Sequence, residues 1–239
     1  MGRLCSVTVA LGLVAGALSA VAVASPQPTA VAAASADAPV VARHARVPAK
    51  APLPGYTWAV TRVTAADLPA SWRPGCPVGP ADLRAVSVTY LDPAGHARRG
   101  TIVVAASVAQ ATADVFGRLY ELRYPIASMR PVDVFGGSDD ASMDADNTSA
   151  FNCRATTGGT SFSEHSYGTA IDLNPVENPY VKCTTVLPAA GRAFVDRSPR
   201  PGVVVAGDAV VKAFAAAGFS WGGSWRTLKD YQHFSVSGN

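Results

Sequence analysis

Two of the four histidines stand in short polar stretches whose residue types can do metal chemistry. The first stretch contains His165 and, seven residues later, Asp172. In one helix these side chains would lie about 10.5 Å apart along the axis, too far to share an ion bound at about 2 Å. In one straight strand they would point to opposite faces, because successive side chains alternate. The spacing therefore predicts that Tyr167 and Gly168 turn the chain between them.

After that turn, residues 169–173 are expected to form a short strand. Ile171 and Leu173 then point to one face of the strand, and Asp172 points to the other. A carboxylate on a buried strand is costly unless it is paired or binds a cation. A metal ion shared with His165 would supply that compensation.

The second polar stretch, W-G-G-S-W followed by D-Y-Q-H-F, places Asp230 three residues before His233. In a helical turn both side chains would point the same way, and a tight turn could also bring them together. One of the two can bind the metal while the other acts on its water. Two neutral imidazoles and one carboxylate leave a coordination position open, as in catalytic zinc sites, and a second carboxylate nearby supplies a general base.

Together these stretches resemble a family of zinc peptidases that act on peptidoglycan. S-E-H-S-Y-G-T-A-I-D-L-N-P, W-G-G-S-W and D-Y-Q-H-F, with Phe151-Asn152-Cys153-Arg154 upstream, look like the D-alanyl-D-alanine carboxypeptidases and L-alanyl-D-glutamate endopeptidases of the hedgehog/DD-peptidase fold. The resemblance covers about residues 75 to 239 and includes an H-x6-D followed by a D-x-x-H in the family's order. It implies an exported zinc metallopeptidase whose partner is the stem peptide of peptidoglycan.

The resemblance also implies a role for each motif residue. It makes His165, Asp172 and His233 the Zn²⁺ ligands, Asp230 the general base, and Arg154 the arginine that polarises the scissile carbonyl. Carboxypeptidase-like members usually carry Glu at the base position, whereas the Asp at this position resembles the endopeptidase-like subgroup. Because a base shorter by one methylene must sit closer to the metal, both cleavage types stay open.

Three further residues near the motifs, Ser163, Tyr167 and Trp225, are expected to shape the substrate pocket or orient the ligands. Two other functions fit some of these residues. A non-catalytic, zinc-stabilised wall-binding module would have no need of a base beside the metal. An iron oxygenase also uses two histidines and a carboxylate, but its first histidine and carboxylate are usually closer in sequence.

The elements that must position these residues mix strands and helices. Residues 85–91 and 100–106 alternate as strands around an Asp-Pro-Ala-Gly turn and predict a β-hairpin. Residues 109–122 and 208–217 have helical spacing, and Gly218 is a stop signal for the second helix. The acidic run from Asp139 to Asp146 is interpreted as a solvated loop. We expect one α+β domain over residues 55–239, with a small antiparallel sheet flanked by helices.

The remaining cysteines of an exported chain could form one disulfide. Cleavage of a signal peptide would remove Cys5 and leave Cys76, Cys153 and Cys183 in an oxidising setting. One pair and one spare thiol is the simplest outcome. We favour Cys76 with Cys153 over Cys153 with Cys183.

The chain begins with a basic Met1-Gly2-Arg3 and an apolar run that ends in Ala-Val-Ala, the pattern of a secretory signal peptide over residues 1–24. A transmembrane anchor is the alternative. Residues 25–54 are rich in Ala, Val and Pro and are expected to be a flexible linker. The sequence thus predicts a secreted, wall-associated bacterial protein with no stable membrane span after cleavage.

The composition of this 239-residue chain excludes some classes of protein and of binding partner. Hydrophobic residues make up 49% and charged residues 15%, which excludes a highly charged disordered chain. The formal charge of +3 is too small and scattered for nucleic-acid binding. We expect a monomer that binds a peptide.

Overall fold

The computed structural model describes residues 54–239. The predicted signal peptide (residues 1–24) and all but the last residue of the predicted linker (25–54) lie outside the described residues. Leu53–Asn239 groups as one compact unit, in agreement with a single domain. Within the described range, no helix is both long and apolar enough to cross a membrane.

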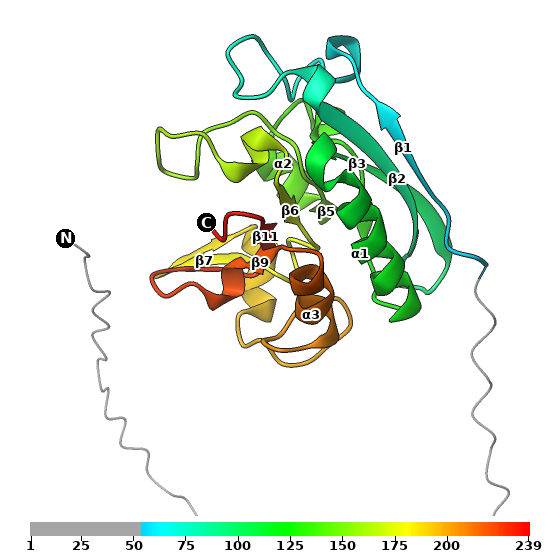
Figure 1. Cartoon of the computed structure of the whole chain (residues 1–239). Helices are drawn as coiled ribbons and strands as arrows, with labels where there is room; N and C mark the ends of the chain where they lie inside the picture. The colour runs from blue at the N-terminus through cyan, green and yellow to red at the C-terminus, as the bar shows by residue number, and fades with distance from the viewer. Residues whose placement is uncertain (1–53) are drawn as a thin grey trace, which may run out of the picture. The chain divides into compact units, whose positions relative to one another are not determined.

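A three-stranded antiparallel sheet forms one side of this unit (Figure 1). The predicted hairpin is present as β2 (Leu83–Leu91) and β3 (Ala97–Ala105), and β1 (Trp58–Arg62) pairs with the other edge of β2. The helix α1 (Ala109–Glu121) lies along this sheet and packs mainly on β2. Its apolar residues repeat at helical spacing, so one side of the helix is buried while the other carries polar residues.

A second antiparallel sheet carries most of the candidate site. Its strand order is β6 (Ala170–Asp172), β11 (His233–Ser235) and β9 (Ser220–Trp221). The helix α3 (Ala209–Ala216) packs beside it, and the rings of Phe214 and Phe234 stack with centroids 3.8 Å apart. This buried contact fixes β11 against the core from the face opposite the polar residues.

The other elements are short. A third antiparallel sheet has the order β10 (Lys229–Asp230), β7 (Tyr180–Lys182) and β8 (Thr185–Leu187). Two further strands, β4 (Ser128–Met129) and β5 (Asn147–Thr148), pair in parallel. The helix α2 (Asp139–Asp144) leads into β5.

The α+β class is confirmed, but two details of the prediction were wrong. The strands form three small antiparallel sheets and a parallel pair instead of one sheet. The acidic run is not a solvated loop, because its first part is the helix α2. Ser138 caps this helix by accepting a hydrogen bond from Ala141 N, and the two acidic residues of its first turn suit the positive end of the helix dipole.

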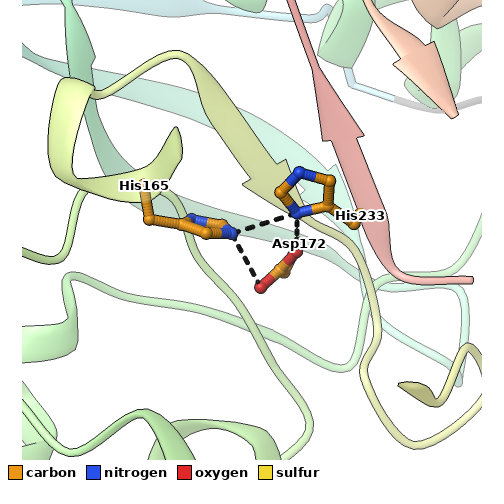
Figure 2. Close-up of side chains that lie close together, drawn as sticks. All are labelled: His165, Asp172 and His233. Carbon is orange, nitrogen blue, oxygen red and sulfur yellow. Dashed lines mark hydrogen bonds and ion pairs between the residues drawn. The ribbon is translucent and has the colours of Figure 1, made fainter. Parts of the chain in front are cut away.

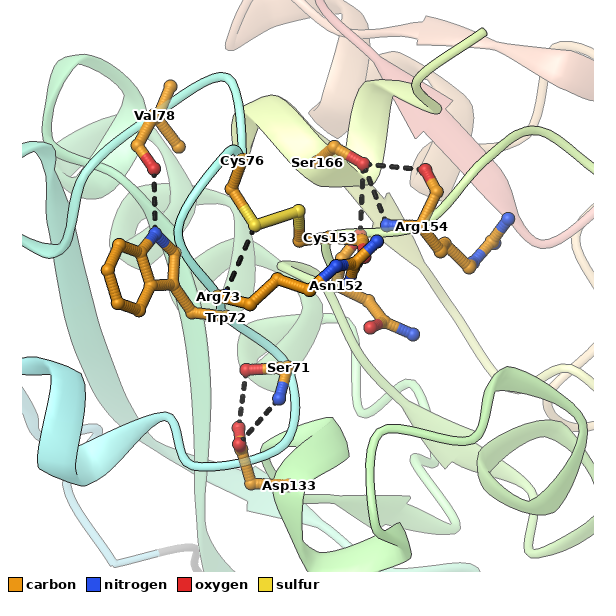
Figure 3. The surroundings of a disulfide bond; sticks show 10 residues. All are labelled: Ser71, Trp72, Arg73, Cys76, Val78, Asp133, Asn152, Cys153, Arg154 and Ser166. Carbon is orange, nitrogen blue, oxygen red and sulfur yellow. Dashed lines mark hydrogen bonds between the residues drawn. A yellow bond between two sulfur atoms is a disulfide. The ribbon is translucent and has the colours of Figure 1, made fainter. Parts of the chain in front are cut away.

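A disulfide links Cys76 to Cys153, with Cα atoms 5.9 Å apart, as the sequence favoured. It ties the segment before β2 to the segment that carries Arg154 (Figure 3). Arg73 supports the same junction, because its Nη1 donates to Cys153 O at 2.6 Å. No cysteine among residues 54–239 is free, and Cys183 is disulfide-bonded too, so the expected spare thiol is not found in this part of the chain.

Candidate metal centre

His165 is held by a short 3-10 helix, Glu164–Tyr167, that precedes β6. Ser163 caps this helix by accepting a hydrogen bond from His165 N at 3.4 Å. Gly168 ends it with a left-handed φ of 69°, and a Cβ there would meet Ala105 N at 2.6 Å. The chain therefore turns where the sequence predicted, and the turn carries His165 back toward the strand that follows.

Asp172 and His233 face each other across neighbouring strands. Asp172 ends β6 and His233 begins β11, and the two residues are directly opposite in the antiparallel register. Directly opposite residues place their side chains on the same face of a sheet. This pairing joins positions 61 residues apart in sequence, and Ile171 points into the core from the other face.

The three side chains converge on one point, as Figure 2 shows. His165 Nε2 lies 3.1 Å from Asp172 Oδ2 and 3.2 Å from His233 Nδ1. His233 Nδ1 lies 3.1 Å from Asp172 Oδ1. All three side chains are at least nine-tenths buried, and the three ligand atoms lie within 4.8 Å of one another.

The outer nitrogens of the two rings show which atoms are free for a cation. His165 Nδ1 lies 2.6 Å from Ala150 O, and His233 Nε2 lies 3.1 Å from Asn239 O. A carbonyl oxygen only accepts, so each of these nitrogens carries the proton of a neutral imidazole. The lone pairs of His165 Nε2 and His233 Nδ1 then face the Asp172 carboxylate. Three lone-pair donors in contact need a positive charge between them, so the group fits a divalent metal ion.

The charges of the group follow from burial and pairing. Burial alone would raise the pKa of Asp172, but His165 and His233 in their protonated form, through charge and hydrogen bonds, outweigh burial and hold that pKa well below its usual range. For His233, burial opposes the charged form, while Asp172 and Asp230 raise the pKa. Asp172 is thus kept as a carboxylate, the form that binds metal.

Asp230 has the opposite electrostatic setting. It lies on β10, where it pairs with Tyr180, and its Oδ1 is buried without a hydrogen-bond partner in the described part of the chain. Burial raises its pKa to about 7; His233 opposes this shift, and Asp172 adds to it. Two neighbouring aspartates whose pKa values are pushed apart are typical of an acid–base site.

Arg154 is held beside this group by an ion pair. Its Nη2 lies 2.9 Å from Asp139 Oδ2, with both side chains mostly buried. Ser166 fixes its backbone, since Ser166 Oγ donates to Arg154 O at 2.7 Å and accepts from Arg154 N at 2.9 Å. Figure 3 shows the hydrogen bonds between Ser166 and Arg154 next to the disulfide. Arg154 Nε is buried and has no hydrogen-bond partner in the range 54–239, so one guanidinium donor is left for a ligand.

A cavity of about 360 Å³ joins these features. Its walls include nearly all the residues singled out from the sequence, namely Arg154, Ser163, His165, Asp172, Trp225, Asp230 and His233. The ring of Trp225 lies 5.4 Å from the ring of His233, and its Nε1 donates to Gly238 O. Tyr167 is the exception: its side chain is 40% exposed and does not line the cavity.

Several residues of the cavity wall were missed in the sequence, and three of them contact residues of the candidate site. Asp139 was placed in a solvated loop, although the Ser-Asp-Asp pattern at positions 138–140 is a helix-start signal that would have fixed its position. Gln232 stands between two motif residues but has no distinctive pattern. Asn239 acts through its backbone oxygen, which a sequence pattern does not report.

Comparison with known proteins finds one family model that is similar to the part of the chain that holds the site. Residues 157–236 match the family model described as D-alanyl-D-alanine carboxypeptidase. No curated protein and no solved structure matches the chain. The matched range includes the His165, Asp172 and His233 group and Asp230, whereas Arg154 precedes it. The resemblance seen in the motifs is confirmed over residues 157–236, which are similar to the D-alanyl-D-alanine carboxypeptidase family.

Proposed function

We propose that this protein is an exported zinc metallopeptidase that hydrolyses peptide bonds in the stem peptides of peptidoglycan. One observation carries the proposal. Two imidazole lone pairs and a carboxylate converge on a cavity whose wall also holds Asp230, a buried carboxyl group with a raised pKa. Two nitrogens and one oxygen are a ligand set of catalytic zinc, which keeps its fourth position for water or substrate.

Zinc would supply Lewis acidity, and Asp230 would carry out the proton transfers of the proposed reaction. When bound, zinc supplies a Lewis acid and lowers the pKa of a water to about 7. Asp230 Oδ1 accepts the proton of the attacking water, and the same carboxyl group returns it to the leaving amine. Burial raises the pKa of Asp230 above that of an exposed carboxyl group, which suits a group that both takes and gives a proton.

Arg154 stabilises the negative charge that develops on the carbonyl oxygen. Asp139 holds one end of the guanidinium through Nη2, and Nε remains as a donor on the cavity wall. A donor that is already in place costs no reorganisation when the charge appears. Ser163 and Trp225 act indirectly, by capping the helix of His165 and by packing against His233.

The bond that is cut is either the terminal D-alanyl-D-alanine bond or the L-alanyl-D-glutamate bond. Asp230, shorter by one methylene than the glutamate of carboxypeptidase-like members, favours the endopeptidase type. Secretion to a bacterial cell wall is part of the proposal and rests on the signal-peptide pattern of residues 1–24 and the Ala/Pro-rich segment after it.

Mass spectrometry of stem peptides incubated with the purified protein tests this function. The wild type is compared with a chelator-treated sample and with Asp230→Asn, which keeps all three ligands. A fragment that appears only with untreated wild type supports the peptidase, and its mass identifies the bond. A protein that binds one zinc ion per chain and cuts no stem peptide would instead be a wall-binding module.

A further inference from the structure

Half of the six buried polar side-chain atoms without a partner in residues 54–239 lie on the wall of one cavity. They are Arg154 Nε, Asp230 Oδ1 and Gln232 Oε1. A buried polar group without a partner is costly, so such groups mark places where a ligand completes the hydrogen bonding. Arg154 and Asp230 already have roles in the proposed reaction. Gln232 has none.

The Gln232 side chain is buried, but its Oε1 acceptor has no hydrogen-bond donor among residues 54–239. The residue is 2% exposed, and its backbone oxygen accepts a hydrogen bond from Leu173 N at 3.0 Å within the sheet of the metal ligands. Its Nε2 lies 3.5 Å from Met143 Sδ, a weak acceptor, and the side chain also hydrogen-bonds the Asp230 carboxyl group. The Oε1 acceptor has no donor, although it lies in the wall of a cavity large enough for part of a peptide.

The polarity of the wall indicates what the missing group is. Gln232 offers an acceptor and Arg154 offers a donor in the same cavity. A peptide unit presents the complement of both, because its N–H donates and its C=O accepts.

We propose that Gln232 is a specificity residue that contacts the substrate, and that its Oε1 accepts a hydrogen bond from a backbone N–H of the bound peptide next to the bond that is cut. The proposal rests on the proposed peptidase function and adds a recognition element to it. It predicts that the protein distinguishes an amide from an ester at one position of its substrate, because an ester lacks the N–H and leaves Oε1 without a donor.

The experiment pairs a variant with a substrate analogue. Gln232→Met keeps the length of the side chain, removes the acceptor and places an apolar group beside Met143. Once mass spectrometry has identified the cut bond, stem peptides are prepared in which one uncut amide at a time is replaced by an ester. For wild type, we expect kcat/KM to be about tenfold lower on one of these esters than on the all-amide peptide. For Gln232→Met, we expect kcat/KM on the all-amide peptide to be about tenfold lower than for wild type, and equal to its kcat/KM on that ester.

Two further variants keep the test decisive. Gln232→Glu retains an acceptor at the same place and should still prefer the amide, even if Gln232→Met is poorly folded. Gln110→Met is the matched control, because Gln110 is exposed on α1 and bonds only Asp114. Zinc content is measured for every variant, since Gln232 precedes a metal ligand.

The outcomes separate this contact from a positioning role. If Gln232→Met still prefers the amide as wild type does, the contact does not exist. If its only effect is a shifted acid limb in the pH profile of kcat, Gln232 orients Asp230 and the proposal is overturned. Calorimetric binding of the amide and ester peptides in an Asp230→Asn background gives the same comparison without cleavage, so it decides the proposal even if wild type cuts no stem peptide and the proposed function fails.

Discussion

The disulfide between Cys76 and Cys153 should stabilise the domain strongly, and the double variant Cys76→Ala/Cys153→Ala measures how much. The two cysteines are 77 residues apart, so the bridge closes a long loop in the unfolded chain. Without the disulfide, the unfolded chain regains the entropy of a loop of 77 residues. By the chain-entropy relation, this lowers the free energy of unfolding by about 4.5 kcal/mol. For a domain of this size that free energy corresponds to a Tm lower by about 9–18 °C.

Urea unfolding followed by fluorescence gives the free energy of unfolding and the m-value for each protein. The m-value should rise in the variant, because the unfolded chain without the bridge exposes more surface. Cys76→Ala alone serves as the control. It removes the same bridge but leaves the Cys153 thiol in its cluster of buried residues with Leu68 and Phe151.

The difference between the single and double variants then reports the packing lost at Cys153, and the difference between wild type and the single variant reports the bridge. A loss below about 1 kcal/mol in the single variant, with an unchanged m-value, would refute the loop-closure reasoning. It would mean that the unfolded chain already holds these two segments close together.

Three further perturbations test the site and its support. Asp230→Asn should lower kcat by about 10²–10⁴-fold and leave zinc content unchanged, because it removes the base and no ligand; normal activity would exclude Asp230 as the base. Gly168→Ala should destabilise the domain by about 1–3 kcal/mol in urea unfolding and weaken zinc binding, since φ is +69° and the new Cβ would meet Ala105 N at 2.6 Å. Burial and the neighbouring Asp146 carboxylate raise the pKa of Glu177 from 4.5 to about 7. The folded state therefore binds the Glu177 proton more tightly than the unfolded state does. The contribution of Glu177 to the free energy of unfolding is full below pH 4.5 and is lost as pH rises through about 7. Glu177→Gln should flatten that part of the pH–stability curve, and an unchanged slope would contradict the assignment.

Much of the local structure could be predicted because it depends on short-range patterns. The hairpin of β2 and β3, the helices α1 and α3 and the turn at Gly168 each follow from residues close together in sequence. The bounds of α1 and α3 differ from the prediction by only one residue at an end. Such elements depend on side-chain periodicity, turn residues and capping groups, which the sequence states directly.

The sequence by itself also determined the chemistry of the site. Two histidines and two aspartates in the order H-x6-D and D-x-x-H predict three side chains that could hold a metal ion and one further carboxyl group as the proposed base. The way in which Asp230 and His233 meet was left open between a helical turn and a tight turn. They lie on separate strands, β10 and β11, because each pairs with a different partner strand.

Only the tertiary structure decided which of these groups are free to react. Strand register places His233 opposite Asp172, and the carbonyls of Ala150 and Asn239 orient the two imidazoles so that their lone pairs converge. Burial raises the pKa of Asp230, and Gln232 Oε1 has no donor among residues 54–239. Desolvation and unsatisfied hydrogen bonds depend on segments far apart in the chain, so no local pattern encodes them.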